Sequence, residues 1–134
     1  MSDKRGIRAI GLVIVPTEDQ DRSIEFYERI GFEKRTDIPI GSSYRWVEVY
    51  PTEGTTGLAL AGPRPGEAVQ PKELGVSLTS EDADATHAEL RGLGVDVDEQ
   101  VSRMGDPVPP MFWFRDPEGH SLMVVETTDR PAAG

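Results

Sequence analysis

The chain of 134 residues contains no cysteine, only two histidines and few aromatic side chains, which make up 7% of it. Without cysteine there is no disulfide framework, no thiolate metal site and no thiol nucleophile. No stretch reaches the ~18 consecutive apolar residues that a membrane-spanning helix needs, and residues 1–8 lack the apolar core of a signal peptide. We therefore expect a cytoplasmic protein that does not bind membranes.

Positive charge is also in short supply, because 24 acidic side chains stand against 14 basic ones and give a net charge of −10. A surface of this sign repels phosphate backbones and anionic lipid, which argues against binding to nucleic acid or to a membrane surface. Solubility alone also explains the acidity. Hydrophobic residues make up only 37% of the chain, but they fall in patterned stretches. We expect one domain, residues 1–134, with a substantial core.

What the sequence does contain is an internal repeat. Residues 17–21 (TEDQD) lie 63 positions before residues 80–84 (SEDAD), and residues 30–33 (IGFE) match residues 93–96 (LGVD) at the same offset. The two matches mark the same points in each half of the chain, and the predicted helices and strands follow the same order in both halves. Duplication of one unit explains this agreement. We expect two modules, residues 7–62 and 73–127, joined by a linker rich in Pro and Gly at residues 63–72.

The predicted elements follow the same order in both modules. Residues 10–15 form an apolar run suited to a buried strand. Thr17 and Gln20 form a capping-box pattern, and a helix with an apolar stripe follows as far as Gly31, which suits a C-cap. The other predicted elements are a helix at residues 82–93 and strands at residues 44–50, 56–61, 74–79, 95–101, 111–114 and 121–125. This pattern indicates the α+β class.

Strand parity divides each predicted sheet into two faces. One face takes the aliphatic side chains on which a helix can pack: Val13, Val15, Val47, Val49, Val76, Leu78, Leu122 and Val124. The opposite face collects Leu12, Ile14, Tyr44, Trp46, Glu48, Tyr50, Gly75, Ser77, Ser121 and Met123. If the sheets curve around this second face, it becomes a cleft with an aromatic wall, which suits an organic ligand. The alternative is that these side chains simply fill a barrel-like interior.

Three segments carry a resemblance to a known family: residues 19–32, with the motifs DQDRSIEFY and IGF, residues 45–47 (RWV) and residues 114–120 (FRDPEGH). In order and spacing they are similar to the glyoxalase/bleomycin-resistance/dioxygenase, or vicinal-oxygen-chelate, superfamily, over roughly residues 8–127. The resemblance implies two tandem βαβββ modules whose curved sheets form a cleft, and commonly a homodimer. Enzymes of this superfamily hold a divalent metal through His, Gln or Glu on the first and last strands of each module. Metal-free members bind a drug or another small molecule in the same cleft.

The metal-ligand positions that the resemblance implies hold unsuitable side chains here. The first-strand positions fall on Leu12 and Gly75, and the last-strand position of the second module falls on Met123. Its counterpart in the first module is Leu60, or Ala59 if the register slips by one. None of these residues offers a hard oxygen or an imidazole nitrogen to Zn, Fe, Mn or Ni. We therefore expect no metal site and no cofactor.

Few other residues suit chemistry. We expect His87 on the solvated face of its helix, and His120 in local hydrogen bonds of its turn or at the mouth of the cleft. Glu48 is the one weak catalytic candidate, because desolvation in an aromatic cleft raises the pKa of a carboxyl group and suits it to acid–base chemistry. Alternatively, Glu48 pairs with Arg45 or Arg103, or faces water.

The leading hypothesis is a metal-independent module that binds a small, partly aromatic molecule through Leu12, Tyr44, Trp46, Glu48, Tyr50, Ser77, Trp113, Ser121 and Met123. Aromatic rings give such a ligand a large contact area, although core packing also explains them. Two alternatives stay open. One is a lyase, isomerase or dioxygenase that uses relocated metal ligands or Glu48, and the other is a structural or regulatory dimer with a vestigial cleft.

Overall fold

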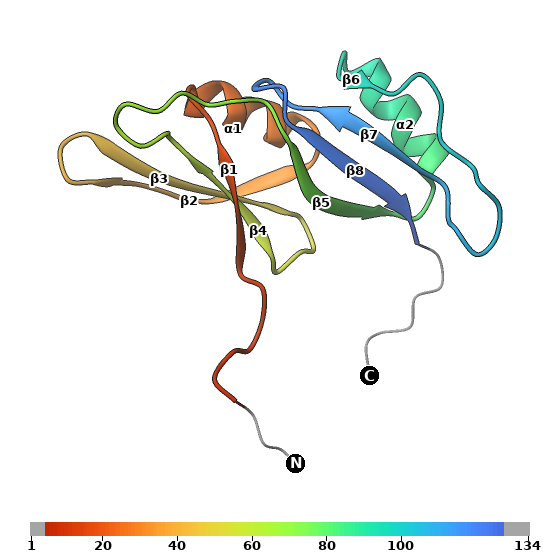
Figure 1. Cartoon of the computed structure of the whole chain (residues 1–134), viewed down its shortest axis with the longest axis horizontal. Coiled ribbons are helices and arrows are strands. Elements are labelled where there is room, and N and C mark those ends of the chain that lie inside the picture. The colour runs from red at the N-terminus through yellow and green to blue at the C-terminus, as the bar shows by residue number, and fades with distance from the viewer. Residues whose placement is uncertain (1–4, 128–134) are drawn as a thin grey trace. The chain divides into compact units, whose positions relative to one another are not determined.

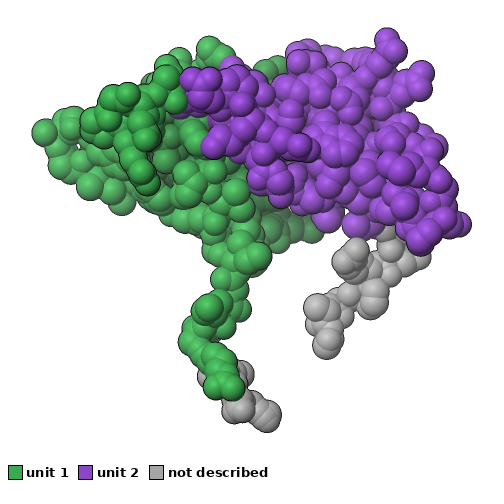
Figure 2. Space-filling model, in the orientation of Figure 1, with its two compact units in different colours: residues 1–68 green, residues 69–134 purple. Residues whose placement is uncertain are grey.

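The computed structural model describes residues 5–127, so the first four residues considered for a signal peptide lie outside it. The elements follow the order strand, helix, three strands, and then the same order again (Figure 1). The chain divides into two compact units, Met1–Ala68 and Val69–Gly134 (Figure 2). Each unit is a four-stranded mixed sheet with one helix. The predicted α+β fold of two βαβββ modules is confirmed. Within the described range no helix is long and apolar enough to span a bilayer.

Unit 1 contains β1 (Leu12–Pro16), α1 (Gln20–Arg29), β2 (Phe32–Ile40), β3 (Tyr44–Pro51) and β4 (Gly57–Ala61). The strand order is β1-β4-β3-β2, with β1 parallel to β4 and the other neighbours antiparallel. The strand β2 has no counterpart among the strands predicted for the first module. Its sequence, FEKRTDIPI, is strongly charged and has a proline near its end, so pairing with β3 along the sheet edge decides its conformation rather than local propensity.

Unit 2 contains β5 (Glu73–Ser80), α2 (Ala83–Gly92), β6 (Asp96–Val97), β7 (Met111–Arg115) and β8 (Ser121–Glu126), in the strand order β5-β8-β7-β6. The strand predicted over residues 95–101 is wrong in length, because only two of its residues pair with β7. The ladder stops where the Asp98 carboxylate accepts a hydrogen bond from the backbone N–H of Trp113 at 3.0 Å. At this point a side-chain oxygen replaces the backbone carbonyl that would accept the next hydrogen bond of the ladder.

Both helices begin with an aspartate N-cap, and these caps lie at equivalent positions of the repeat. The carboxylates of Asp19 and Asp82 each accept a hydrogen bond at 3.0 Å from the backbone N–H three residues further on. The predicted capping box of Thr17 and Gln20 is therefore wrong. The Gln20 amide instead donates to one backbone carbonyl on β3 and one on β4, both at 2.8 Å, which fixes the start of α1 against the sheet.

The core of each unit lies between its helix and one face of its sheet. On the sheets, the five most buried aliphatic positions predicted for this face are at most 3% exposed: Val15, Val47, Val49, Leu122 and Val124. The helices contribute Ile24, Phe26, Tyr27, Ala83 and Leu90. Within each unit the helix covers one face of the sheet. The side chains of the opposite face are therefore not buried by the helix of their own unit.

Candidate functional site

One face of the unit 1 sheet carries three of the four aromatic side chains predicted to bind a ligand. The register places Ile14, Ala59, Glu48 and Thr36 in one row across the four strands. Trp46 and Tyr50 lie two residues either side of Glu48 on β3, so all three project from the same face. We call Trp46, Glu48 and Tyr50 the β3 triplet. Strand parity predicts this grouping.

The β3 triplet is joined by direct hydrogen bonds. The indole Nε1 of Trp46 donates to Glu48 Oε2 at 2.7 Å, and the Tyr50 hydroxyl donates to Glu48 Oε1 at 2.8 Å. Donation from Trp46, then from Tyr50, and also from Thr36 favours the ionised carboxylate and lowers the pKa of Glu48. The hydrogen bond from the Tyr50 hydroxyl to Glu48 also raises the pKa of Tyr50. The predicted upward shift for Glu48 is wrong, because these hydrogen bonds outweigh desolvation of a half-buried side chain.

The ring of Tyr50 is held from outside the triplet. The guanidinium carbon of Arg35 on β2 lies 4.6 Å from the ring centroid, a cation–π distance. The Arg35 nitrogens also donate to three carbonyl oxygens of the turn between β3 and β4. On β4, a Cβ placed on Gly57 would lie 2.6 Å from Cε2 of Tyr50. Gly57 therefore leaves the space that this ring occupies, a common reason for glycine within a strand.

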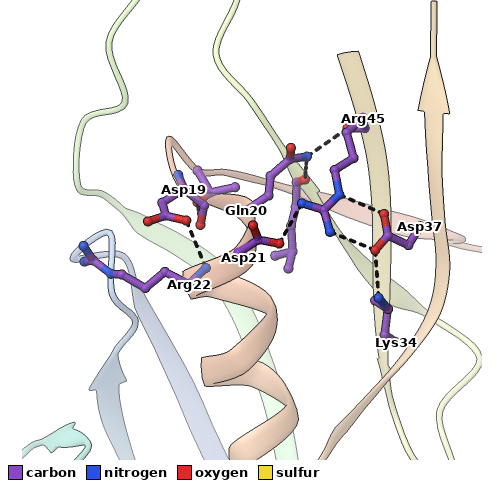
Figure 3. A network of polar contacts seen from close by, with 9 residues as sticks. Asp19, Gln20, Asp21, Arg22, Lys34, Asp37 and Arg45 are labelled. Carbon is purple, nitrogen blue, oxygen red and sulfur yellow. Dashed lines mark hydrogen bonds and ion pairs between the residues drawn. The ribbon is translucent and has the colours of Figure 1, made fainter. Parts of the chain in front are cut away.

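Glu48 is not neutralised by a nearby cation. Arg45 donates to both carboxylate oxygens of Asp37 and to Asp21, each at 2.8 Å (Figure 3). With Lys34, Arg45 holds the pKa of Asp37 well below its usual range. Arg103 pairs with Asp84 in unit 2. The predicted pairing of Glu48 with Arg45 or Arg103 is wrong. Among residues 5–127, Glu48 takes part in no ion pair.

The equivalent row in unit 2 has a different chemistry. The register aligns Ser77, Met123 and Trp113 across β5, β8 and β7. The predicted ligand-binding residues thus fall into two groups, Leu12, Tyr44, Trp46, Glu48 and Tyr50 in unit 1, and Ser77, Trp113, Ser121 and Met123 in unit 2. The cleft between modules that the resemblance implies stays a prediction, as does binding by any of these residues.

The last-strand metal-ligand position of unit 1 is settled by the register. Ala59 pairs with Ile14 and Glu48 and therefore shares their face. Leu60 pairs with Val15 and belongs to the helix-covered face, where it is fully buried. Ala59, rather than Leu60, is therefore the counterpart of Met123.

The residues at the implied metal-ligand positions do not fit a metal. None of their side chains carries a hard oxygen or an imidazole nitrogen, and the positions hold Leu12, Ala59, Gly75 and Met123. Gly75 also lies in an irregular part of β5, where the register shifts between Glu73 and Ser77, and its φ is +71°. In the described part of the chain, no three His, Asp or Glu side chains gather around one point.

The two histidines serve the fold of unit 2. His120 is fully buried, its backbone N–H donates to Asp116 at 2.9 Å, and its Nδ1 accepts from the Lys72 backbone at 3.2 Å. The backbone of His120 thus makes the predicted local bond of the turn, whereas its imidazole bonds the chain just before β5. The prediction of a solvated His87 is wrong, because its Nε2 donates to the Asp98 carbonyl at 2.6 Å and its ring packs edge-on against Phe112.

Comparison with known proteins decides the family. The profile of the Glyoxalase/Bleomycin resistance protein/Dioxygenase superfamily matches residues 9–124. The chain belongs to this superfamily. The resemblance read from its motifs is confirmed, and the fold agrees with that of solved members of the superfamily.

Three relatives of this superfamily member are informative. TnmS3, an antibiotic binding protein from Streptomyces sp. CB03234, is 30% identical, with 93% of this chain and 100% of TnmS3 covered and a TM-score of 0.77. A superfamily member from Sphaerobacter thermophilus DSM 20745 is 27% identical over 90% of this chain and 98% of its own, with a TM-score of 0.81. YetH of Bacillus subtilis (strain 168) is 27% identical over 126 residues, which are 90% of this chain and 99% of YetH.

Sequence reasoning missed the residues that hold the β3 triplet in place. Thr36 and Arg35 lie on β2, which was not among the predicted strands. Gly57 falls within the strand predicted at residues 56–61, but nothing there marks it as a neighbour of Tyr50. A glycine at the start of an otherwise apolar strand is the signal that could have found it, because such a glycine often marks the close approach of another group.

Proposed function

We propose that this protein binds a small, partly aromatic molecule without a metal, with the β3 triplet at the centre of the binding face. The observation that carries the proposal is the triplet itself, an indole and a phenol hydrogen-bonded to one carboxylate on the sheet face that α1 does not cover. The indole offers a ligand a flat contact area, and the carboxylate offers a directed acceptor. Ligand sites commonly combine a largely apolar lining with a few such polar groups.

The surroundings of the triplet support this proposal. Ile38 is the cross-strand partner of Trp46 and is 50% exposed, while Ile14 and Tyr44 on the same face are 52% and 39% exposed. Large apolar side chains grouped on one surface commonly mark an interaction site. A ligand seated against the triplet would remove part of this apolar surface from water.

The relatives support the same class of function. TnmS3 is described as an antibiotic binding protein and is similar to this chain over nearly its whole length. The side chains at the metal-ligand positions of this chain are unsuited to a metal, which supports binding that is independent of one.

Catalysis by Glu48 is the weaker hypothesis. A general acid at neutral pH needs a carboxyl pKa that is raised toward neutrality, whereas the hydrogen bonds of the triplet lower the pKa of Glu48. Both of its oxygens are also already held by aromatic donors. This arrangement favours a fixed acceptor over a group that exchanges its proton with a substrate.

The test is a titration of the protein with a panel of planar aromatic antibiotics and dyes, with and without EDTA, by calorimetry and tryptophan fluorescence. We expect binding that EDTA does not change. The chain has two tryptophans, so Trp113→Phe leaves Trp46 as the sole reporter, and we expect its fluorescence to be quenched by the ligand. Trp46→Phe should weaken binding and lose most of the quenching. Absence of binding throughout the panel, or its abolition by EDTA, would contradict the proposal.

A further inference from the structure

We infer that the binding face selects a planar aromatic cation, with its charged nitrogen held by Glu48 and its ring against Trp46. This inference rests on the proposed function and names the class of ligand. It follows from the charges around the triplet, from the acceptor sites that remain on the carboxylate, and from the rigidity of the aromatic partners.

Among the described residues of unit 1, no cation forms an ion pair with Glu48. Arg45 and Lys34, from the same and the adjacent strand, are both paired with Asp37. Arg35 is paired with Glu33 and also donates to turn carbonyls. The hydrogen bonds to Glu48 come from an indole N–H and a phenol hydroxyl, neither of which carries a charge. A cationic ligand would supply the missing opposite charge, and its hydrogen bond to a carboxylate is stronger than one between neutral groups.

The carboxylate also has room for a further donor. An ionised carboxylate offers about four acceptor sites on its two oxygens, and the hydrogen bonds from Trp46 and Tyr50 take two of them. A ligand that brings an N–H can use a site that remains. A neutral ligand that only accepts hydrogen bonds gains nothing from Glu48, and an anion is repelled by it.

The aromatic partners are held in advance of binding. Tyr50 lies between the Gly57 backbone and the Arg35 guanidinium and hydrogen-bonds Glu48, while the Trp46 indole is fixed by its own bond to Glu48. Groups already fixed in the bound geometry lose little freedom when a ligand arrives. Indole is also the aromatic side chain that attracts a cation most strongly.

A charge series on one ring system tests the inference. Proflavine is a cation near neutral pH, acridone is neutral and acridine-9-carboxylate is an anion, and all three share a flat tricyclic frame. We expect proflavine to bind the unmodified protein at least about tenfold more tightly than acridone, the size of effect expected for a hydrogen bond to a charged group. The carboxylate should bind most weakly. This comparison needs no variant, so it does not depend on the folding of one.

Two glutamate substitutions locate the preference. Glu48→Gln keeps the shape of the side chain and an acceptor oxygen but removes the charge, and we expect it to reduce the preference for proflavine over acridone to about twofold or less. Glu25→Gln is the matched control, because it removes the same charge from an exposed position on α1. We expect Glu25→Gln to keep the full preference.

The following results would overturn the inference. Equal binding of proflavine and acridone by the unmodified protein removes the charge selection but leaves the proposed binding function standing. A preference that survives in Glu48→Gln, or that both variants lose equally, assigns the effect to overall charge rather than to this carboxylate. Failure of all three compounds to bind, while other uncharged aromatic compounds do bind, rejects a cation as the ligand. Failure of every aromatic compound rejects the proposed function as well.

Discussion

The two units share their topology and even individual hydrogen bonds. The hydroxyl groups of Thr17 and Ser23 lie 2.7 Å apart at the start of α1, and those of Ser80 and Thr86 lie 2.6 Å apart at the start of α2. In each pair the first hydroxyl also accepts a hydrogen bond from the N–H of the aspartate N-cap. The duplication is therefore preserved in detail where a helix leaves a strand, because this turn has to satisfy the same unpaired backbone groups in both units.

The units differ in where they place their large side chains. The matching rows of Glu48 with Ala59 and Trp113 with Met123 make Val47 and Val49 the counterparts of Phe112 and Phe114. All four are fully buried. In unit 1 the aromatic bulk of the core comes from the helix, through Phe26 and Tyr27, whereas α2 buries only Ala83 and Leu90. The comparison teaches that each core is filled, but from opposite sides of the helix–sheet interface.

The sheet faces opposite the helices differ in polarity at the same register position. Glu48 in unit 1 corresponds to Trp113 in unit 2, and Gly57 corresponds to Ser121. In unit 1 the glycine admits the Tyr50 ring. In unit 2 the serine lies opposite Arg115, which is paired with Asp96 and Asp98. One module thus has a carboxylate among aromatic rings, while the other has an indole beside a charged network.

The largest effect is expected from truncating the strand side of the two cores. Phe112→Ala should lower the free energy of unfolding by about 3–5 kcal/mol, because it removes a fully buried ring and leaves a cavity. Val47→Ala, at the equivalent position of unit 1, should cost only about 2 kcal/mol, since fewer buried carbons are lost. Chemical denaturation of both variants measures the difference. Equal losses would show that the two cores do not differ in the way described.

A smaller effect is expected at the glycine beneath Tyr50. Gly57→Ala places a Cβ within contact of the Tyr50 ring, so the ring must shift away, and we expect a loss of about 1–3 kcal/mol in stability. The shift should also lengthen the bond from Tyr50 to Glu48 and lower the pKa of Tyr50 toward its ordinary value, which ultraviolet absorbance during an alkaline titration measures.

The control for this variant is Ser121→Ala in unit 2, which adds no volume. We expect it to change stability by no more than about 0.5 kcal/mol and to leave the Tyr50 titration as it is. If Gly57→Ala leaves both stability and the Tyr50 titration unchanged, the ring is not confined by the glycine.

The smallest effect is a dependence of stability on pH. It is expected at Glu48 in unit 1 and not at Trp113, the equivalent position in unit 2. The pKa of Glu48 is lower in the folded protein than its ordinary value of 4.5. Its ionised form therefore stabilises the fold above about pH 4.5, and this stabilisation is lost as the pH falls through the folded pKa. Glu48→Gln should be less stable than the unmodified protein near neutral pH, and the two unfolding free energies should converge in acid. Trp113→Phe, at the equivalent position, should differ from the unmodified protein by a constant amount. A constant difference for Glu48→Gln as well would contradict the assigned pKa shift.

Local signals account for the parts of the fold that the sequence predicts well. Apolar runs predict β1 and β8, and the glycines after α1 and α2 mark the helix ends. The strand β2 is not predicted, because its charged sequence gains its extended conformation from pairing with β3, which lies later in the chain. The length of β6 is not predicted, because the Asp98 side chain replaces a backbone hydrogen bond of the ladder.

The site is predictable to a similar depth. A period of two places Trp46, Glu48 and Tyr50 on one face without any knowledge of the fold. Which way the three side chains lean toward one another depends on their rotamers, and these depend on Arg35 and Gly57 from two other strands. The direction of the Glu48 pKa shift follows from those hydrogen bonds. Parity places Glu48 among aromatic rings but does not show these bonds, so desolvation alone predicts a shift of the wrong sign.

The irregular backbone at Gly75 limits which side chains that position can carry. A histidine there would have to adopt a φ of +71°, which residues other than glycine seldom do. A metal ligand at this position would therefore require the strand to be rebuilt between Glu73 and Ser77, with shortening of its extra residues, and not a single substitution. In unit 1, by contrast, Leu12 lies in a regular strand. The two equivalent positions thus differ in how easily they could be engineered, because a ligating side chain fits the backbone at Leu12 and not at Gly75.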